Sequence, residues 1–163
     1  MSRPLVYSFP PVADDRARVL ILGSMPGVLS LAENQYYAHP RNLFWPIMGS
    51  LFGAGRDVAY EQRLRLLQDH RIALWDVLHS CQRDGSLDSD IQCEVANNFA
   101  TFFNTYPQIT HVFFNGGKAE SSFRKHVRDV GQGLVMTRLP STSPAHASLS
   151  FEEKLAAWSQ IRI

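Results

Sequence analysis

The sequence has little cysteine and no long apolar run. Its 163 residues include two cysteines, Cys81 and Cys93, so the chain alone cannot build a four-cysteine iron–sulfur cluster or zinc ribbon. We expect both thiols to be reduced. No apolar stretch reaches the roughly 18 residues that a membrane span needs, and no basic segment followed by an apolar signal core stands at the N-terminus. These absences predict a cytoplasmic protein that does not engage a membrane.

An excess of charge of either sign is also missing. The 16 Lys and Arg residues are nearly balanced by 15 Asp and Glu residues, for a formal charge of +1, which argues against coating nucleic acid by bulk electrostatics. The six histidines show no H-x-x-x-H or comparable ligand spacing. We therefore expect no metal and no cofactor. The length and ordinary composition predict one domain over residues 1–163.

Apolar runs alternate with helical patterns along the chain. The unbroken runs predict buried strands over 19–22, 72–78, 111–114 and 134–137. The patterns between them predict helices over 43–51, 60–69, 90–106, 118–130 and 150–160, the last with a capping box of Ser150 and Glu153. Residues 1–18 suggest an extended arm or edge strand, and residues 79–88 a loop. The fold class is thus α/β: a three-layer α/β/α sandwich with a largely parallel four-stranded sheet.

The unusual segments of this sequence follow predicted strands. Residues 23–42 form a long stretch before a helix pattern begins at Leu43, and Asn42 stands where an N-cap belongs. Residues 115–117 and 139–146 follow two other strands. In open parallel sheets ligands bind outside the carboxyl ends of the strands. We therefore expect the three segments to meet at one edge of the sheet.

The chemistry of these segments fits a neutral polar ring. The sequence has no G-x-S-x-G elbow, no phosphate-binding G-x-x-x-x-G-K-[ST] loop and no G-x-G-x-x-G dinucleotide motif. The three segments instead supply amides, hydroxyls, aromatic rings and two histidines. Such a set suits a nucleobase, which stacks on an aromatic face while an amide pairs with its edge.

Three motifs carry a resemblance to a known family. GSMPG at 23–27, YYAHPRNLFW at 36–45 and LPSTSPAHA at 139–147 resemble the uracil-DNA glycosylase superfamily. Within it the chain is most similar to the hypoxanthine-DNA glycosylase family, and next to the mismatch-specific uracil glycosylases. The resemblance implies a monofunctional DNA repair glycosylase, acting as a monomer, that flips out a deaminated base and hydrolyses its N-glycosidic bond. Hypoxanthine is the first expected base, with uracil and xanthine as alternatives, and the product is an abasic site in DNA.

The resemblance also implies roles for single residues. Catalysis falls to Asn42, which either holds the base or fixes the water, with Ser24 beside it. The expected base-binding residues are Gly23, Met25, Pro26, Tyr37, His39 and Asn115, among which Tyr37 stacks on the flipped base. The expected DNA-binding residues are Arg41, Lys118, Ser141, Thr142, Ser143, Pro144, Ala145 and His146.

Two positions depart from the wider superfamily. Met25 stands where the mismatch-specific enzymes have an asparagine that positions the attacking water, and a thioether cannot do this. Ser141 stands where the archetypal uracil enzymes have a histidine. An asparagine amide can pair with N1–H and O6 of hypoxanthine, whereas adenine offers the opposite pattern. Uracil offers the same N–H and C=O pair, and the neutral Asn42 cannot be a general base.

Simpler interpretations exist for several of these residues. Asn42 could only cap a helix, Tyr37 could close over the core, and His39 could hydrogen-bond the backbone to shape its loop. Asn115 could be a turn former and His146 a local cap, while Phe44 and Trp45 have the spacing of core residues. Two other functions also stay open: a catalytically silent nucleic-acid or nucleotide-binding module of the same fold, and a small-molecule hydrolase that uses Ser24.

Overall fold

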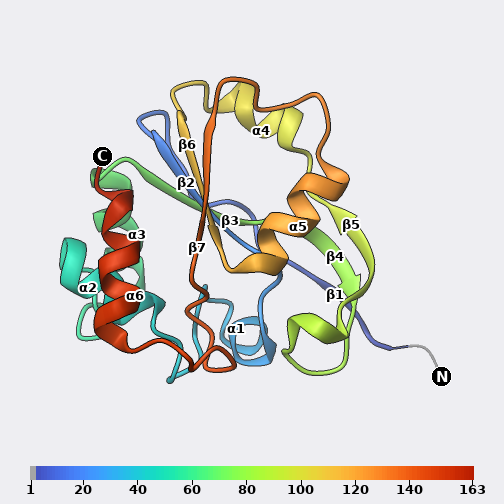
Figure 1. Cartoon of the computed structure of the whole chain (residues 1–163), viewed down its shortest axis with the longest axis horizontal. Coiled ribbons are helices and arrows are strands. Elements are labelled where there is room, and N and C mark those ends of the chain that lie inside the picture. Colours follow the sequence, from blue (N-terminus) through green and yellow to red (C-terminus); the bar gives the residue numbers. More distant parts are fainter. Residues whose placement is uncertain (1–2) are drawn as a thin grey trace.

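The structure, a computed structural model, describes residues 3–163 (Figure 1). Residues 1 and 2, the start of the predicted arm, lie outside the described residues. The strands are β1 Leu5–Tyr7, β2 Val19–Gly23, β3 Ile72–Asp76, β4 Leu78–Gln82, β5 Gln92–Ala96, β6 His111–Asn115 and β7 Val135–Leu139. The α-helices are α1 Val28–Glu33, α2 Phe44–Phe52, α3 Tyr60–Asp69, α4 Phe99–Thr105, α5 Gly117–His126 and α6 Phe151–Trp158, with short 3-10 turns η1 Asp88–Asp90 and η2 Ser159–Ile161.

The central sheet has four parallel strands in the order β3-β2-β6-β7. Every residue of β2 and β3 is buried, because both faces of the sheet are covered by other elements. This burial explains why these strands are continuous apolar runs rather than alternating ones. The predicted parallel four-stranded sheet is confirmed.

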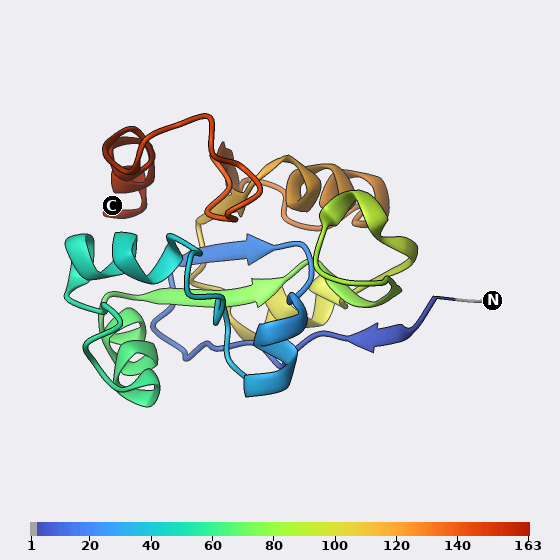
Figure 2. The same ribbon diagram turned by 90° about the horizontal axis from the view of Figure 1, so that it is seen from below.

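Helices cover both faces of this sheet, as two perpendicular views show (Figures 1 and 2). Val19 and Ile21 of β2 pack with α2, α3 and α6, whereas Leu20 and Leu22 pack with α4 and α5, as the alternation of side chains along a strand requires. The predicted three-layer sandwich is therefore confirmed. Phe44 and Trp45 of α2 are fully buried, which confirms them as core residues.

A second sheet was not predicted. Strands β1, β4 and β5 form an antiparallel sheet in the order β1-β4-β5, so the arm at residues 5–7 does form an edge strand. The loop predicted at 79–88 is wrong over 79–82, which belong to β4. The helix predicted at 90–106 is confirmed over α4, which carries Phe99 and Phe102, but is wrong over β5, where Ile91 and Val95 only continue the spacing of a helical stripe. Strand β5 is largely exposed and depends on its pairing with β4, which periodicity cannot reveal.

The long segment after β2 contains a helix that was also missed. Helix α1 has six residues, no side-chain cap at Gly27, and ends at Asn34 in the left-handed region with φ 56°. Its apolar residues Val28 and Leu29 are exposed, so the sequence shows no amphipathic stripe there. The N-cap of α2 is Leu43 rather than Asn42. The capping box of Ser150 and Glu153 at α6 is confirmed.

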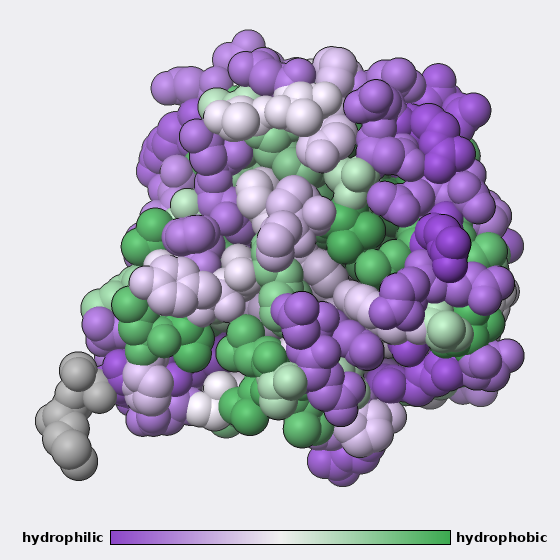
Figure 3. All heavy atoms as spheres, turned by 180° about the vertical axis from the view of Figure 1, so that it is seen from behind, coloured by the Kyte–Doolittle hydropathy of each residue, from purple (hydrophilic) through white to green (hydrophobic). Residues whose placement is uncertain are grey.

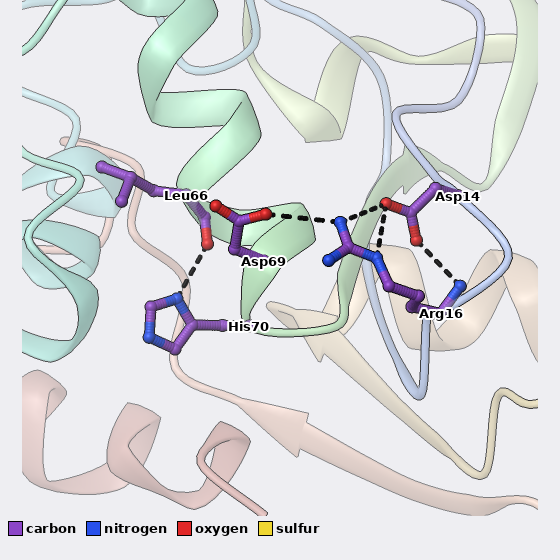
Figure 4. A network of polar contacts seen from close by, with 5 residues as sticks. All are labelled: Asp14, Arg16, Leu66, Asp69 and His70. Carbon is purple, nitrogen blue, oxygen red and sulfur yellow. Dashed lines mark hydrogen bonds and ion pairs between the residues drawn. The ribbon is translucent and has the colours of Figure 1, made fainter.

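The edge at the amino ends of β2 and β3 carries a small polar network (Figure 4). The guanidinium of Arg16 lies 2.8 Å from the carboxylate of Asp14 and 3.3 Å from that of Asp69, and His70 Nδ1 lies 2.8 Å from the carbonyl oxygen of Leu66. These exposed pairs contribute little to stability. They are all at the opposite edge of the sheet from the unusual segments.

The surface of the described part of the chain mixes hydrophilic and apolar side chains. Over residues 3–163, no helix combines the length and apolar character needed to cross a bilayer. Seen from behind, apolar side chains form small areas between hydrophilic ones (Figure 3). The exposed large apolar residues include Leu5, Tyr7 and Val95 of the antiparallel sheet.

Candidate active site

A cleft of about 590 Å³ opens at the carboxyl ends of the central strands. It lies where strand order reverses between β2 and β6, the place at which open parallel sheets bind ligands. Figure 1 shows α1, the η1 region and the segment after β7 gathered along this edge. The lining residues come from segments 23–30, 36–42, 86–89 and 141–146, together with Asp76 and Asn115. The predicted meeting of three segments is therefore observed, with the 86–89 segment as a fourth.

The side chain of Asn115 holds the segment after β7 in place. Its Nδ2 donates to Thr142 Oγ1 at 2.9 Å, and its Oδ1 accepts from the backbone N–H of Thr142 at 2.9 Å. Thr142 is buried, and its carbonyl accepts from the N–H of Leu43 at 3.0 Å. Asn115 is thus more than a turn former, because it connects the end of β6 to the 141–146 segment and onward to the start of α2.

The other end of the 141–146 segment is fixed by a buried lysine. Lys154 of α6 is 3% exposed, and its Nζ donates to the carbonyl oxygen of His146. Burial lowers the pKa of Lys154. The exposed imidazole of His146 is left to face the mouth of the cleft, where Arg41 is also exposed. An imidazole and a guanidinium therefore stand at the mouth of the cleft.

Asn42 lies on the wall of the cleft in a constrained loop. Its Oδ1 accepts from the backbone N–H of Phe44 at 2.9 Å, and Arg56 donates to its carbonyl oxygen at 3.1 Å and to that of His39 at 2.6 Å. His39 Nδ1 accepts from the N–H of Arg41 at 3.1 Å, which confirms a loop-shaping role for His39. With Oδ1 engaged, the Nδ2 group of Asn42 is the part best placed to donate to a ligand.

Tyr37 forms part of the cleft with its ring held from behind. The residue has φ 56°, and its ring stacks on Phe44 with centroids 4.1 Å apart and an interplanar angle of 29°. Its Oη is buried without a hydrogen-bond partner among residues 3–163. Burial raises the pKa of the Tyr37 hydroxyl, and the nearby Asp76 carboxyl raises it further. The face of the ring away from Phe44 is suited to stacking.

Two carboxyl groups that the sequence interpretation missed lie on the floor and rim of the cleft. Asp76 ends β3, is 3% exposed and lies beside Gly23. Burial first, and then the neighbouring Asp88, raise its pKa from 3.8 to about 7, against a lowering by Arg83. Asp88 accepts a 2.6 Å hydrogen bond from Ser24 Oγ. The hydroxyl of Ser24 thus donates to a carboxylate. A serine nucleophile would instead require a histidine as its hydrogen-bond partner.

Almost all the residues named from the sequence line this cleft. The exception is Lys118, whose Nζ is 2.7 Å from the carboxylate of Glu94 and which is not part of the lining. The lining includes Gly23, Ser24, Met25, Pro26, Tyr37, His39, Arg41, Asn42, Asn115, Ser141, Thr142, Ser143, Pro144, Ala145 and His146.

One protein family matches this sequence over nearly its whole length. The model for the uracil DNA glycosylase superfamily matches residues 10–162. The chain belongs to the uracil DNA glycosylase superfamily.

Individual members of the uracil DNA glycosylase superfamily are similar along almost the whole chain. A hypoxanthine DNA glycosylase of Methanosarcina barkeri is 34% identical over 93% of this chain and 94% of its own length. One of Methanosarcina acetivorans is 39% identical over 87% and 89%. The solution NMR structure of a protein proposed to be a uracil DNA glycosylase, also from Methanosarcina acetivorans, superposes with a TM-score of 0.80 at 35% identity, covering 98% of this chain and all of that one.

The cleft lacks the asparagine that the mismatch-specific uracil glycosylases have at the position of Met25. Met25 is buried, packs with the core and lines the cleft, but its thioether cannot orient a water as an asparagine amide does. A sequence signal did exist for Asp76, because it is a charged residue inside the apolar run 72–78. No group of three or more His, Cys, Asp or Glu side chains that could hold a metal ion lies within residues 3–163.

Proposed function

We propose that this chain is a monomeric DNA glycosylase that removes hypoxanthine from DNA and leaves an abasic site. The observation that carries the proposal is the presence of Tyr37, Asn42 and the 141–146 segment in one cleft of about 590 Å³. That space accommodates a purine turned out of the duplex, and a stacked base bonded at its edge is how enzymes hold an extruded nucleotide. The two hypoxanthine DNA glycosylases that are similar to this chain support the choice of base.

The residues divide the work by chemistry. The free face of the Tyr37 ring stacks on the base, and Asn42 Nδ2 donates to its carbonyl oxygen. The 141–146 segment contacts the DNA backbone, with Arg41 and His146 at the mouth of the cleft. The C1′–N9 bond breaks with its electron pair leaving on the base. A water oxygen then bonds to C1′, and the proton that the water loses neutralises the departing base.

Excision is tested directly on damaged duplexes. Purified protein is incubated with duplexes that contain deoxyinosine, deoxyuridine or deoxyxanthosine, followed by alkaline cleavage of abasic sites. We expect strand scission at deoxyinosine, and a fall of about 100-fold or more in Asn42→Ala. Binding of the inosine duplex without any scission would instead identify a catalytically silent binding module. Equal rates for the wild type and Asn42→Ala would show that Asn42 has no role in the reaction.

A further inference from the structure

Asp76 is a buried residue of the cleft to which none of the expected roles applies. Its carbonyl oxygen accepts from Asn97 Nδ2 at 2.8 Å, but its carboxyl oxygen Oδ2 is buried without a partner among residues 3–163. Asp76 is one of the residues that line the cleft. A buried carboxyl with an unpaired oxygen is costly unless a ligand completes its hydrogen bonds.

The absence of a side chain at Gly23 lets this carboxyl reach the floor of the cleft. A Cβ atom at residue 23 would lie 2.5 Å from Asp76 Oδ1 and 3.0 Å from Tyr37 Oη. Two polar groups, the Asp76 carboxyl and the Tyr37 hydroxyl, therefore meet beside Gly23. Since Tyr37 Oη is also without a partner among residues 3–163, two unpaired hydrogen-bonding groups lie together at this point of the cleft.

The charged and titratable groups around Asp76 favour its neutral form. Asp88, on η1, is a second carboxylate, and Tyr36 and Tyr37 are buried hydroxyls that offer no positive charge. Arg83 follows β4 and is the nearby cation, but its Nη2 donates to the carbonyl oxygen of Pro26. Burial and the repulsion from Asp88 outweigh Arg83, so that the pKa of Asp76 is raised to about 7.

We infer that Asp76 binds the flipped base as a neutral carboxylic acid, accepting from the ring N–H and donating its O–H to the adjacent ring carbonyl. This inference rests on the proposed function. A neutral carboxylic acid carries one donor and one acceptor, as a side-chain amide does, whereas a carboxylate only accepts. The N–H and C=O pair occurs side by side in hypoxanthine, uracil and xanthine. Ionisation of Asp76 removes its O–H as a second donor to the base carbonyl, beside Asn42 Nδ2, and sets two negative centres against each other as the base departs.

The test is the pH dependence of excision in two variants. We measure kcat/KM on a deoxyinosine duplex from pH 6 to pH 8, because this parameter reports the free enzyme. With a pKa of about 7, the neutral fraction of Asp76 falls about tenfold over this range, and wild-type kcat/KM should fall with it. Asp76→Asn keeps a donor and an acceptor at every pH, so its profile should be flat. Asp76→Ala should be at least about 30-fold slower than the wild type at pH 6.

The alternative role for Asp76 is as a carboxylate that takes a proton from the attacking water. Wild-type kcat/KM that rises through pH 7, with Asp76→Asn as slow as Asp76→Ala, would establish that role and overturn the inference. A tenfold fall retained in Asp76→Asn would overturn it too, because another group would then be titrating. Thermal unfolding of each variant at each pH shows that the folded protein is being compared.

Binding of free hypoxanthine tests this inference independently of the proposed function. Wild-type protein that releases no base at any pH contradicts the proposed function. In that case calorimetric binding of free hypoxanthine still tests Asp76. We expect binding about tenfold weaker at pH 8 than at pH 6 in the wild type, and equal at both in Asp76→Asn. Equal wild-type affinity at the two pH values would overturn the inference.

Discussion

Asn115 and Thr142, 27 residues apart in the chain, exchange two hydrogen bonds of 2.9 Å in the wall of the cleft. Both functional groups of the Asn115 side chain take part, so the amide is engaged even without a ligand. The carbonyl of Thr142 continues the connection to the N–H of Leu43, next to Asn42. The geometry of the loop that carries Asn42 therefore depends on a threonine from the segment that follows β7.

Replacing Thr142 by valine should impair excision, because it breaks the hydrogen bond that Asn115 Nδ2 donates to the Thr142 hydroxyl. Valine keeps the shape and the backbone N–H but removes the acceptor of Asn115 Nδ2, leaving that donor unpaired. We expect a loss of about 1–3 kcal/mol in the free energy of unfolding and a fall of about 10- to 100-fold in excision rate. Thr142→Ser keeps the hydroxyl and should stay near the wild type. A Thr142→Val enzyme with the wild-type rate would show that the pair does not position the cleft.

The structural role of Asn42, as acceptor for the Phe44 N–H, can be separated from its proposed role in excision by comparing Asn42→Ala with Asn42→Asp. Asn42→Ala loses the acceptor for the Phe44 N–H and should cost about 1 kcal/mol in the free energy of unfolding. Asn42→Asp keeps this acceptor, so its stability should be close to that of the wild type, but it loses the Nδ2 donors. Both variants should lose about 100-fold or more in excision rate. Denaturant unfolding and the deoxyinosine assay measure the two effects; an active Asn42→Asp enzyme would assign the function to Oδ1.

Tyr37 should act through its ring rather than its hydroxyl. Tyr37→Phe removes a buried Oη that has no partner among residues 3–163, so the variant should be equally stable or up to about 1 kcal/mol more stable. Tyr37→Leu keeps an apolar side chain but removes the aromatic face, and we expect its excision rate to fall about 10- to 100-fold, the equivalent of one lost stacking contact. The ratio of the Phe and Leu rates is the decisive measurement, and a ratio near one would exclude stacking by Tyr37.

Glu94 should make the free energy of unfolding fall at acidic pH. Burial raises its pKa, but hydrogen bonds from Lys118 and Ser122 outweigh this effect and lower the pKa from 4.5 to about 2. A lowered pKa stabilises the folded state above pH 4.5, and this stabilisation is lost as the pH falls from 4.5 toward 2. Glu94→Gln should therefore be about 1–2 kcal/mol less stable than the wild type at pH 6. Urea unfolding at pH 6 and pH 3 should show this difference shrinking in acid; a constant difference would contradict the assignment.

Ionisation of Asp76 should destabilise the folded state, whereas ionisation of Glu94 stabilises it. The pKa of Asp76 is raised from 3.8 to about 7, so the folded state binds the proton more tightly than the unfolded state. No penalty exists below pH 3.8; the folded state loses stability as the pH rises from 3.8 to about 7, and the loss is complete above 7. Asp76→Asn avoids the penalty and should be roughly 2–4 kcal/mol more stable than the wild type at pH 8. At pH 4 urea unfolding should give similar values for the two proteins, and a similar result at pH 8 would contradict the raised pKa.

The elements that sequence patterns could predict are those whose own burial determines their composition. The runs that became β2, β3 and β6 are apolar because both sheet faces are covered, and α6 shows its capping box directly. Strand β5 could not be predicted, since its exposed residues depend on pairing with β4. Helix α1 was missed because it lacks a side-chain cap and exposes Val28 and Leu29.

The sequence predicted the site residues that stand in loop motifs. It did not predict the two carboxyl groups, Asp76 and Asp88. The segments containing Tyr37, Asn42 and Thr142 follow predicted strands, so the topology alone brings them to one edge. Asp76 was read as part of a strand, because a single charge does not break an apolar run. Asp88 was missed since the loop that carries it returns to the cleft only through the antiparallel sheet.

The hydrogen bond from Lys154 to the carbonyl of His146 has a consequence for the order in which the protein becomes functional during its synthesis. The central sheet is complete once β7 has paired with β6, yet the segment that follows β7 is held at its far end by a lysine from the last α-helix. A chain that ends near residue 146 would have all four strands of the central sheet but not the lysine that holds the carbonyl of His146. The cleft is therefore complete only after the last α-helix has been made and has packed against the sheet.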